Sequence, residues 1–128
     1  MDNTNDNNKN MNSMADDDII NDEQFEDMRD LLEEDFLDLI QIYFNDSKQR
    51  IITLRHALAN NDNAAGFEAA HALKGASANL GTTTVMVLSG QLQESCRDNT
   101  IHAQIALINT LSTALEQAEK EINRRMEP

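Results

Sequence analysis

The single proline of this 128-residue chain is its last residue, Pro128, and the chain contains only four glycines. Proline and glycine are the residues that most strongly interrupt helices, so long helices can run through most of the sequence. Aromatic residues make up only 4% of the chain, whereas an all-β fold needs more turn residues and more alternation of aromatic and β-branched residues. The sequence therefore predicts an all-α protein with one domain.

Apolar residues recur at steps of three and four along five segments, which is the period of an amphipathic helix. A short helix is predicted across residues 22–31, and longer helices across 34–59, 64–80, 82–97 and 101–125. The last helix is expected to direct one apolar stripe inward, formed by Ile101, Ile105, Ile108, Leu111, Leu115, Ala118 and Ile122. Four long helices joined by short turns pack most simply as an antiparallel up-down-up-down four-helix bundle. We expect the short acidic helix to lie across one end of it.

The net charge of −13 is concentrated near the N-terminus, because residues 1–35 hold 13 acidic and two basic side chains. Such a chain lacks the basic surface that nucleic acid binding requires. Residues 1–18 are rich in Asn and Asp with almost nothing to bury, and we expect them to form a disordered tail. The bundle domain is expected to occupy residues 19–128.

The lone cysteine, Cys96, excludes an internal disulfide and a cysteine metal site, and we expect it to pack inward as a small hydrophobic residue. The N-terminal residues lack the basic and apolar segments of a secretory signal. No stretch approaches the ~18 apolar residues that span a membrane. We therefore expect a cytoplasmic monomer without a membrane partner.

His71 stands on an unusual part of the helix predicted at 64–80, because Lys74 and Gly75 follow it by one turn. Glycine inside a helix costs about 1 kcal/mol relative to alanine, and open space above the imidazole would explain its presence. A helical wheel gathers the small and apolar residues on one buried face, formed by Gly66, Ala69, Ala70, Leu73, Ala76, Ser77 and Leu80. His71 lies away from that face, so it should be exposed on the flank of the bundle.

An exposed histidine of this kind is suited to act as a nucleophile toward a phosphoryl group carried by another protein. Imidazole side chains are largely neutral near pH 7 and then keep one nitrogen lone pair free. Lys74 could neutralise phosphoryl oxygens, and Gly75 would leave room for the donor's backbone. Phe67, Glu68 and Ala78 are predicted to surround His71 in the partner-binding surface.

The exposed half of the helix at 34–59 is predicted to extend this docking surface. Ser77 points inward on the wheel and is expected to bond a carbonyl one turn back. His56 and His102 have no comparable neighbours and are interpreted as ordinary surface residues.

The pattern His-x-Leu-Lys-Gly-x-Ser-x-x-Leu-Gly across residues 71–81 resembles the histidine-containing phosphotransfer (HPt) domain of two-component phosphorelays. The resemblance extends over residues 20–125. It implies that His71 accepts a phosphoryl group from the receiver domain of a hybrid sensor histidine kinase and passes it to the receiver domain of a response regulator. It also implies that Lys74 neutralises phosphate charge and that Gly75 provides access. The chain would then be a phosphocarrier and not an enzyme, with no cofactor of its own and with Mg²⁺ on the receiver.

Two other interpretations remain. A non-catalytic adaptor could bind a partner protein through the same flank of the bundle. A carboxylate-bridged metal enzyme would use Glu-x-x-His pairs on facing helices, and Glu68 with His71 forms one such pair. No second pair occurs, and both side chains are predicted to point outward. No P-loop pattern is present, so no kinase activity is expected. The chain begins at Met1, which favours a free-standing protein over an excised piece of a hybrid kinase.

Overall fold

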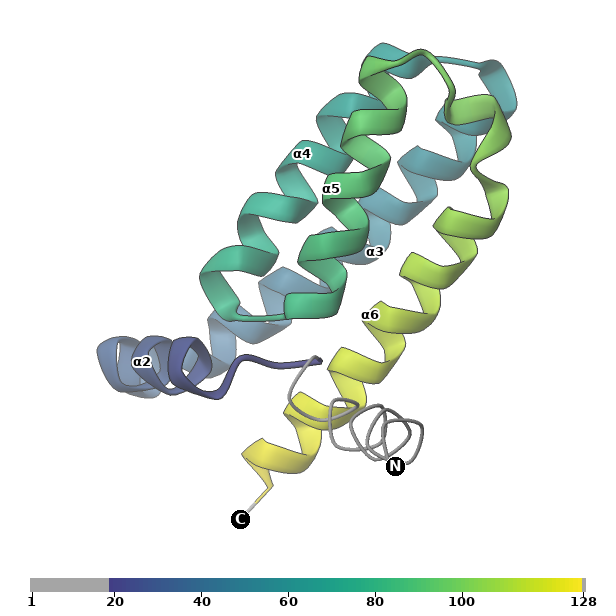
Figure 1. Ribbon diagram of the computed structural model, residues 1–128. Coiled ribbons are helices and arrows are strands. Elements are labelled where there is room, and N and C mark those ends of the chain that lie inside the picture. Colours follow the sequence, from purple (N-terminus) through teal and green to yellow (C-terminus); the bar gives the residue numbers. More distant parts are fainter. Residues whose placement is uncertain (1–18, 128) are drawn as a thin grey trace, which may run out of the picture.

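The computed structural model describes residues 19–127 as helices joined by short connections. In chain order they are α2 (Asp22–Leu32), a 3₁₀ turn (Glu33–Asp35), α3 (Phe36–Asn60), α4 (Asn63–Leu80), α5 (Thr83–Arg97), a second 3₁₀ turn (Ile101–Ala103) and α6 (Ile105–Met126). Figure 1 shows α3 to α6 side by side in an antiparallel bundle, with α2 across one end. The predicted all-α four-helix bundle and its crossing N-terminal helix are confirmed. The disordered tail predicted at residues 1–18 lies outside the described residues.

A continuous apolar core joins the four long helices. α4 packs between α3 and α5, and α6 closes the bundle against the same two helices. The largest fully buried side chains in these helices are Phe36, Leu54, Leu73, Leu80, Val85, Leu92, Ile108, Leu111 and Ile122. Burying one large apolar side chain contributes about 1.5–3 kcal/mol, so this core fixes which face of each helix meets solvent. Cys96 belongs to the core as predicted, and burial raises the pKa of its thiol. Among residues 19–127, no helix combines the length and the apolar character that a membrane crossing requires.

The segment predicted as one last helix over 101–125 is divided in the structure. A 3₁₀ turn ends at Ala103, and the backbone leaves helical geometry at Gln104 (φ −108°, ψ 28°) before α6 begins. Ile101 is fully buried beside Gly66, where an added Cβ would lie 2.5 Å from the Ile101 Cδ1 atom. Ile105, predicted to face inward, is 50% exposed. The prediction was wrong because the packing of Ile101 against α4 shifts the helical phase between the two segments.

Backbone hydrogen bonds hold the segment before α2 against the turn between α4 and α5. The Asn21 amide donates to the Gly81 carbonyl over 2.7 Å, and the Thr83 amide donates to the Ile19 carbonyl over 3.1 Å. Gly81 has a φ of +94°, a conformation that favours glycine. The turn that ends α4 therefore also receives the segment that leads into α2.

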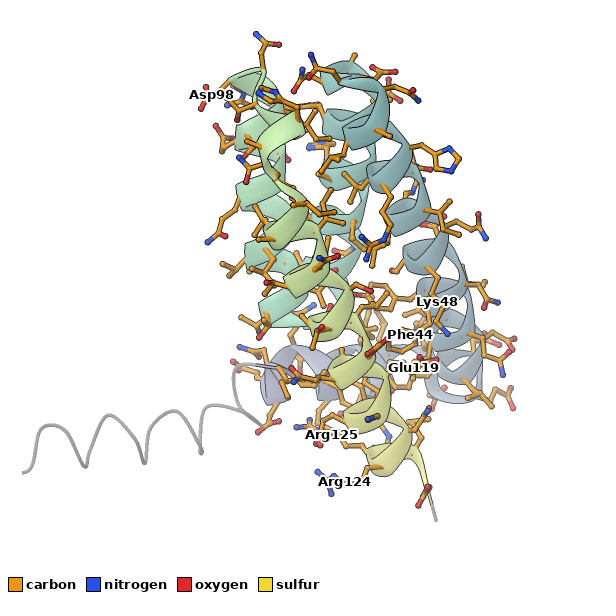
Figure 2. All side chains as sticks on the ribbon, turned by 90° about the vertical axis from the view of Figure 1, so that its right-hand side faces the viewer. Phe44, Lys48, Asp98, Glu119, Arg124 and Arg125 are labelled. Carbon is orange, nitrogen blue, oxygen red and sulfur yellow. The ribbon has the colours of Figure 1, made fainter. Side chains whose placement is uncertain are left out.

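A charged cluster at the C-terminal end of α6, where Figure 2 shows Arg124 and Arg125, also contacts α2. Arg125 forms an ion pair of 2.8 Å with Asp22, and its guanidinium carbon lies 5.4 Å from the ring centre of Phe25. The same arginine donates over 2.7 Å to Glu121, which is only 9% exposed. Hydrogen bonds from Arg124, and then from Arg125, lower the pKa of Glu121 from 4.5 to about 2.

We expect Glu121→Gln to lower the free energy of unfolding at pH 7 by on the order of 1–2 kcal/mol. Because the folded-state pKa is depressed, the carboxylate stabilises the fold fully above about pH 4.5 and loses this effect as the pH falls toward about 2. Denaturant unfolding of the wild type and the variant should therefore converge across this range.

Glu119→Gln provides the matched control on the same helix. Glu119 pairs with Lys48 over 3.1 Å at the surface (Figure 2), and exposed pairs contribute about 0–1 kcal/mol. An equal loss of stability in both variants, or a Glu121→Gln loss that persists unchanged at pH 2, would contradict the assignment.

Candidate functional site

α4 carries the candidate site, and both of its ends are defined by local interactions. The Asp62 side chain accepts a hydrogen bond of 3.0 Å from the Ala65 amide at the N-terminus, and Gly81 ends the helix. The residues buried along it are Gly66, Ala69, Ala70, Leu73, Ser77 and Leu80, which belong to the face predicted from the helical wheel. His71 lies near the middle of α4 and is exposed, as predicted.

The imidazole of His71 makes a hydrogen bond to the neighbouring helix. Its Nδ1 atom lies 3.1 Å from the Oε1 atom of Gln93 on α5, a side chain that is only 6% exposed. An amide oxygen can only accept, so Nδ1 carries the proton in this arrangement and Nε2 keeps its lone pair. The contact with Gln93 therefore favours the tautomer of a neutral ring whose Nε2 can act as a nucleophile.

Gln93 was not identified from the sequence as a site residue. The feature that could have identified Gln93 is its place beside the inward face of the helix. It directly follows Leu92 and lies four residues after Ser89, and both of these residues are fully buried. A glutamine beside the inward face of a helix needs a hydrogen-bond partner. The sequence does not show that the partner is His71, because this depends on how α5 is rotated against α4.

Phe67 lies one turn before His71 and is half-buried against the core. Its ring is stacked on the imidazole, with the ring centres 5.9 Å apart and the planes inclined by 7°. The guanidinium carbon of Arg97 on α5 lies 5.6 Å from the centre of the Phe67 ring. The partner contact predicted for Phe67 stays a prediction, but the structure shows that this ring also contacts His71 within the chain.

Lys74 is exposed one turn after His71, and its aliphatic stem lies across α5 at Gly90. A Cβ atom placed on Gly90 would be 3.7 Å from both Cδ and Cε of the lysine. Within residues 19–127, no carboxylate is paired with the Lys74 ammonium. The ammonium is therefore available to an incoming anion.

The surface beside His71 is open at the predicted positions. A Cβ atom built on Gly75 meets no atom within 4 Å. Glu68 and Ala78 are both exposed on the same side of α4. The exposed positions of Glu68 and His71 also differ from the inward-facing arrangement that a metal bundle uses.

Ser77 points inward as predicted, but its partner differs from the expected carbonyl. Its Oγ atom lies 2.8 Å from the hydroxyl of Tyr43, which is also 2.6 Å from Thr82 Oγ1. Burial raises the pKa of Tyr43, so the hydroxyl keeps its proton for this network. The carbonyl partner expected for Ser77 was wrong because that expectation considered α4 alone, whereas the partner is Tyr43 on α3.

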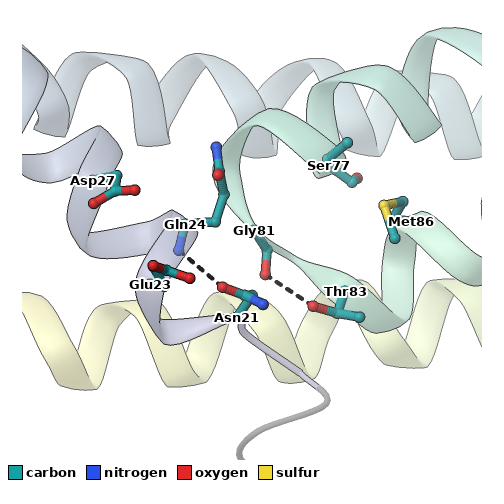
Figure 3. Close-up of a pocket in the computed structure, with 9 residues that line it drawn as sticks. Asn21, Glu23, Gln24, Asp27, Ser77, Gly81, Thr83 and Met86 are labelled. Atoms are coloured by element: carbon teal, nitrogen blue, oxygen red, sulfur yellow. Dashed lines mark hydrogen bonds between the residues drawn. The ribbon is translucent and has the colours of Figure 1, made fainter.

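Two hollows flank the C-terminal half of α4. An apolar groove of about 230 Å³ runs between α2, α3 and α4, lined by Met28, Leu39, Ile42, Tyr43, Asp46, Ala76, Asn79 and Leu80. Ile42 is 64% exposed at its edge, and the docking role of the outer face of the helix at 34–59 stays a prediction. A second, more polar pocket lies between α2 and the turn at Gly81, with Glu23 and Asp27 on one side and Met86 on the other (Figure 3).

Comparison with known proteins agrees with the fold and the motif. A comparison with curated proteins finds no match. The fold is similar to that of histidine-containing phosphotransfer protein B (HptB) from Pseudomonas aeruginosa PAO1, with a TM-score of 0.78 and 24% sequence identity over 85% of this chain and 97% of that one. The family model of the Hpt domain matches residues 38–121, which include His71 and its neighbours. Hpt domains are phosphotransfer proteins of two-component systems that interact with receiver domains, and they are carriers rather than kinases. Because the family model matches well over half of this chain, the chain belongs to the Hpt domain family.

Proposed function

We propose that this protein is a phosphorelay intermediate in which His71 accepts a phosphoryl group from an aspartyl phosphate on the receiver domain of a hybrid sensor histidine kinase. The group then passes to an aspartate on the receiver domain of a response regulator. The observation that supports this most directly is an exposed imidazole whose Nδ1 is bound by buried Gln93, which leaves the Nε2 lone pair for attack.

The transfer requires little chemistry beyond positioning and charge stabilisation. Nε2 forms a bond to phosphorus as the bond between phosphorus and the aspartyl oxygen breaks, and the receiver carboxylate leaves. The ring becomes a phosphoimidazolium that keeps its proton on Nδ1, and this N–H donates a hydrogen bond to Gln93 Oε1. The reverse sequence delivers the group to the second receiver.

Lys74 is proposed to stabilise the oxygens of the transferring group. We expect Lys74→Ala to slow transfer from a phosphorylated receiver about 10-fold or more, because charge-assisted contacts to developing negative charge contribute strongly. Lys74→Arg should retain most of the rate, since it preserves the cation. The measurement is the single-turnover rate of label transfer at saturating receiver. Equal rates for Lys74→Ala and the wild type would remove this role, while a matching melting temperature would show that the fold is unchanged.

The receiver is proposed to dock on the face of α4 that carries His71. Glu68 and Ala78 lie exposed along this face, and Phe67 borders it. The apolar groove next to Ala76 and Asn79 would extend the contact toward α2 and α3, where Leu31 is 74% and Ile42 is 64% exposed. An apolar groove with exposed apolar side chains nearby is a feature of many protein-binding surfaces.

In the proposed role, the protein needs no cofactor of its own. The phosphoryl group comes already activated on another protein, so no nucleotide site is required in this chain. Mg²⁺ would act at the aspartate of the receiver domain. We therefore propose a carrier that has no autokinase activity.

The test is the transfer of label from a phosphorylated receiver domain to this protein, followed by mass spectrometry under alkaline conditions that preserve phosphohistidine. Label on His71 supports the phosphorelay role. Stable receiver binding without any label would support the alternative, an adaptor that uses the same flank without phosphotransfer. Incubation with ATP and Mg²⁺ but no receiver should leave the protein unlabelled, and label there would contradict the carrier role.

A further inference from the structure

We infer that Phe67 is a positioning residue for the imidazole of His71, an inference that rests on the proposed phosphotransfer at this ring. The nucleophile is exposed on a helix surface, where a histidine side chain can change rotamer, and rotation about its second side-chain torsion is only weakly restricted. Productive attack requires the lone pair to lie in line with the bond that breaks. The ring must therefore be held by groups of this chain before the receiver arrives.

The hydrogen bond from Nδ1 to Gln93 restrains only one point of the ring. The bond of 3.1 Å sets the direction of Nδ1, but an imidazole can tilt about that atom while keeping the bond. The nearly parallel stack on Phe67, with an inclination of 7°, restrains the plane of the ring. Together the two contacts define both the direction and the tilt of Nε2.

Phe67 is suited to this role because it is itself immobilised. It lies four residues before His71, and this spacing brings two side chains together on one helix face. Its ring is half-buried against the core, and Arg97 on α5 covers it at 5.6 Å. A centre-to-centre distance of 5.9 Å with parallel planes is the offset arrangement that aromatic pairs prefer. A flat ring at this position therefore acts as a fixed surface for the imidazole.

A positioning role for Phe67 can be distinguished from a role in receiver contact alone. A positioning residue influences every reaction of His71, including those with a donor too small to dock. Phosphoramidate is such a donor: Nε2 bonds to phosphorus, the phosphorus–nitrogen bond breaks, and ammonia leaves. A docking residue would influence only the reaction with the receiver.

The experiment compares the wild type with Phe67→Leu, which keeps a large apolar side chain but removes the flat ring, and with Phe67→Tyr, which keeps the ring. We expect Phe67→Leu to slow labelling of His71 about three- to tenfold with both phosphoramidate and the phosphorylated receiver. Phe67→Tyr should restore the rate to within about twofold of the wild type. Leu107→Ala on α6, which also removes a half-buried side chain packed on the core, controls for loss of packing and should leave both rates unchanged.

NMR of the imidazole nitrogens and ring protons provides a second readout that does not depend on transfer. The unmodified protein should show His71 protonated mainly on Nδ1, with ring protons shifted by the aromatic ring of Phe67. In Phe67→Leu this shift of the ring protons should disappear. A wild-type His71 with the averaged signals of a free imidazole would overturn the inference, even if Phe67→Leu failed to fold.

The remaining outcomes are also decisive. A rate loss confined to the receiver reaction would assign Phe67 to docking and overturn the inference, as would unchanged rates in Phe67→Leu. If the receiver never labels wild-type His71, the proposed function fails, while the NMR signals and the phosphoramidate rates still decide whether Phe67 holds the ring.

Discussion

Replacement of His71 by glutamine is expected to abolish phosphoryl transfer completely while leaving the fold intact. Glutamine has a similar length and a better helix propensity than histidine, and His71 is exposed and outside the core. The amide has no lone pair of comparable nucleophilicity, so no phosphoryl group can be accepted. Helical content by circular dichroism and the melting temperature should match those of the wild type, and labelling by a phosphorylated receiver should be absent.

Two other histidines provide matched controls for this result. His56 on α3 and His102 in the second 3₁₀ turn are also exposed, and glutamine at either position should leave labelling unchanged. Retained phosphorylation in His71→Gln would refute the assignment of the acceptor. Loss of labelling in His56→Gln or His102→Gln alone would move the acceptor to that residue.

A second large effect is expected at Gly75, where catalysis and stability should change in opposite directions. A Cβ atom at this position meets nothing within 4 Å, so the fold has room for a larger side chain. Replacing an exposed helical glycine by leucine should stabilise the protein by up to about 1 kcal/mol. The same side chain would project beside His71 and prevent the close approach of a receiver. Displacement of the reacting groups by about 1 Å can reduce rates on the order of 100-fold, and we expect a loss of this size.

The measurement is the rate of label transfer from a phosphorylated receiver to Gly75→Leu, together with its thermal unfolding. Gly75→Ala should show the gain in stability with a much smaller loss of rate, because a methyl group adds little bulk. Labelling by phosphoramidate should persist in both variants, since this donor needs no docking surface. Normal transfer to Gly75→Leu would show that open space at this position is not needed, and a fall in its melting temperature would contradict the open surroundings of Gly75.

The local pattern of the sequence was sufficient for the helices up to α5 and for the exposed position of His71. Apolar residues at helical spacing define a buried face whichever neighbour covers it, so the buried side of α4 and the open side with Gly75 and Ala78 follow from one helix alone. The end of α4 at Gly81 is also local, because it depends on the left-handed conformation that favours glycine. The motif at residues 71–81 lies within a single helix and its cap, so the resemblance to the family was visible without the fold.

The contacts that prepare the imidazole were decided only by the tertiary structure. Gln93 lies 22 residues from His71, and its hydrogen bond depends on the rotation and register of α5 against α4. The same reason applies to the bond between Ser77 and Tyr43, and to the break before Ile105, which follows from the docking of Ile101 against Gly66. Helical periodicity predicts the buried face of a single helix, whereas only the packing of helices distant in sequence determines where a helix is interrupted and which side chains meet.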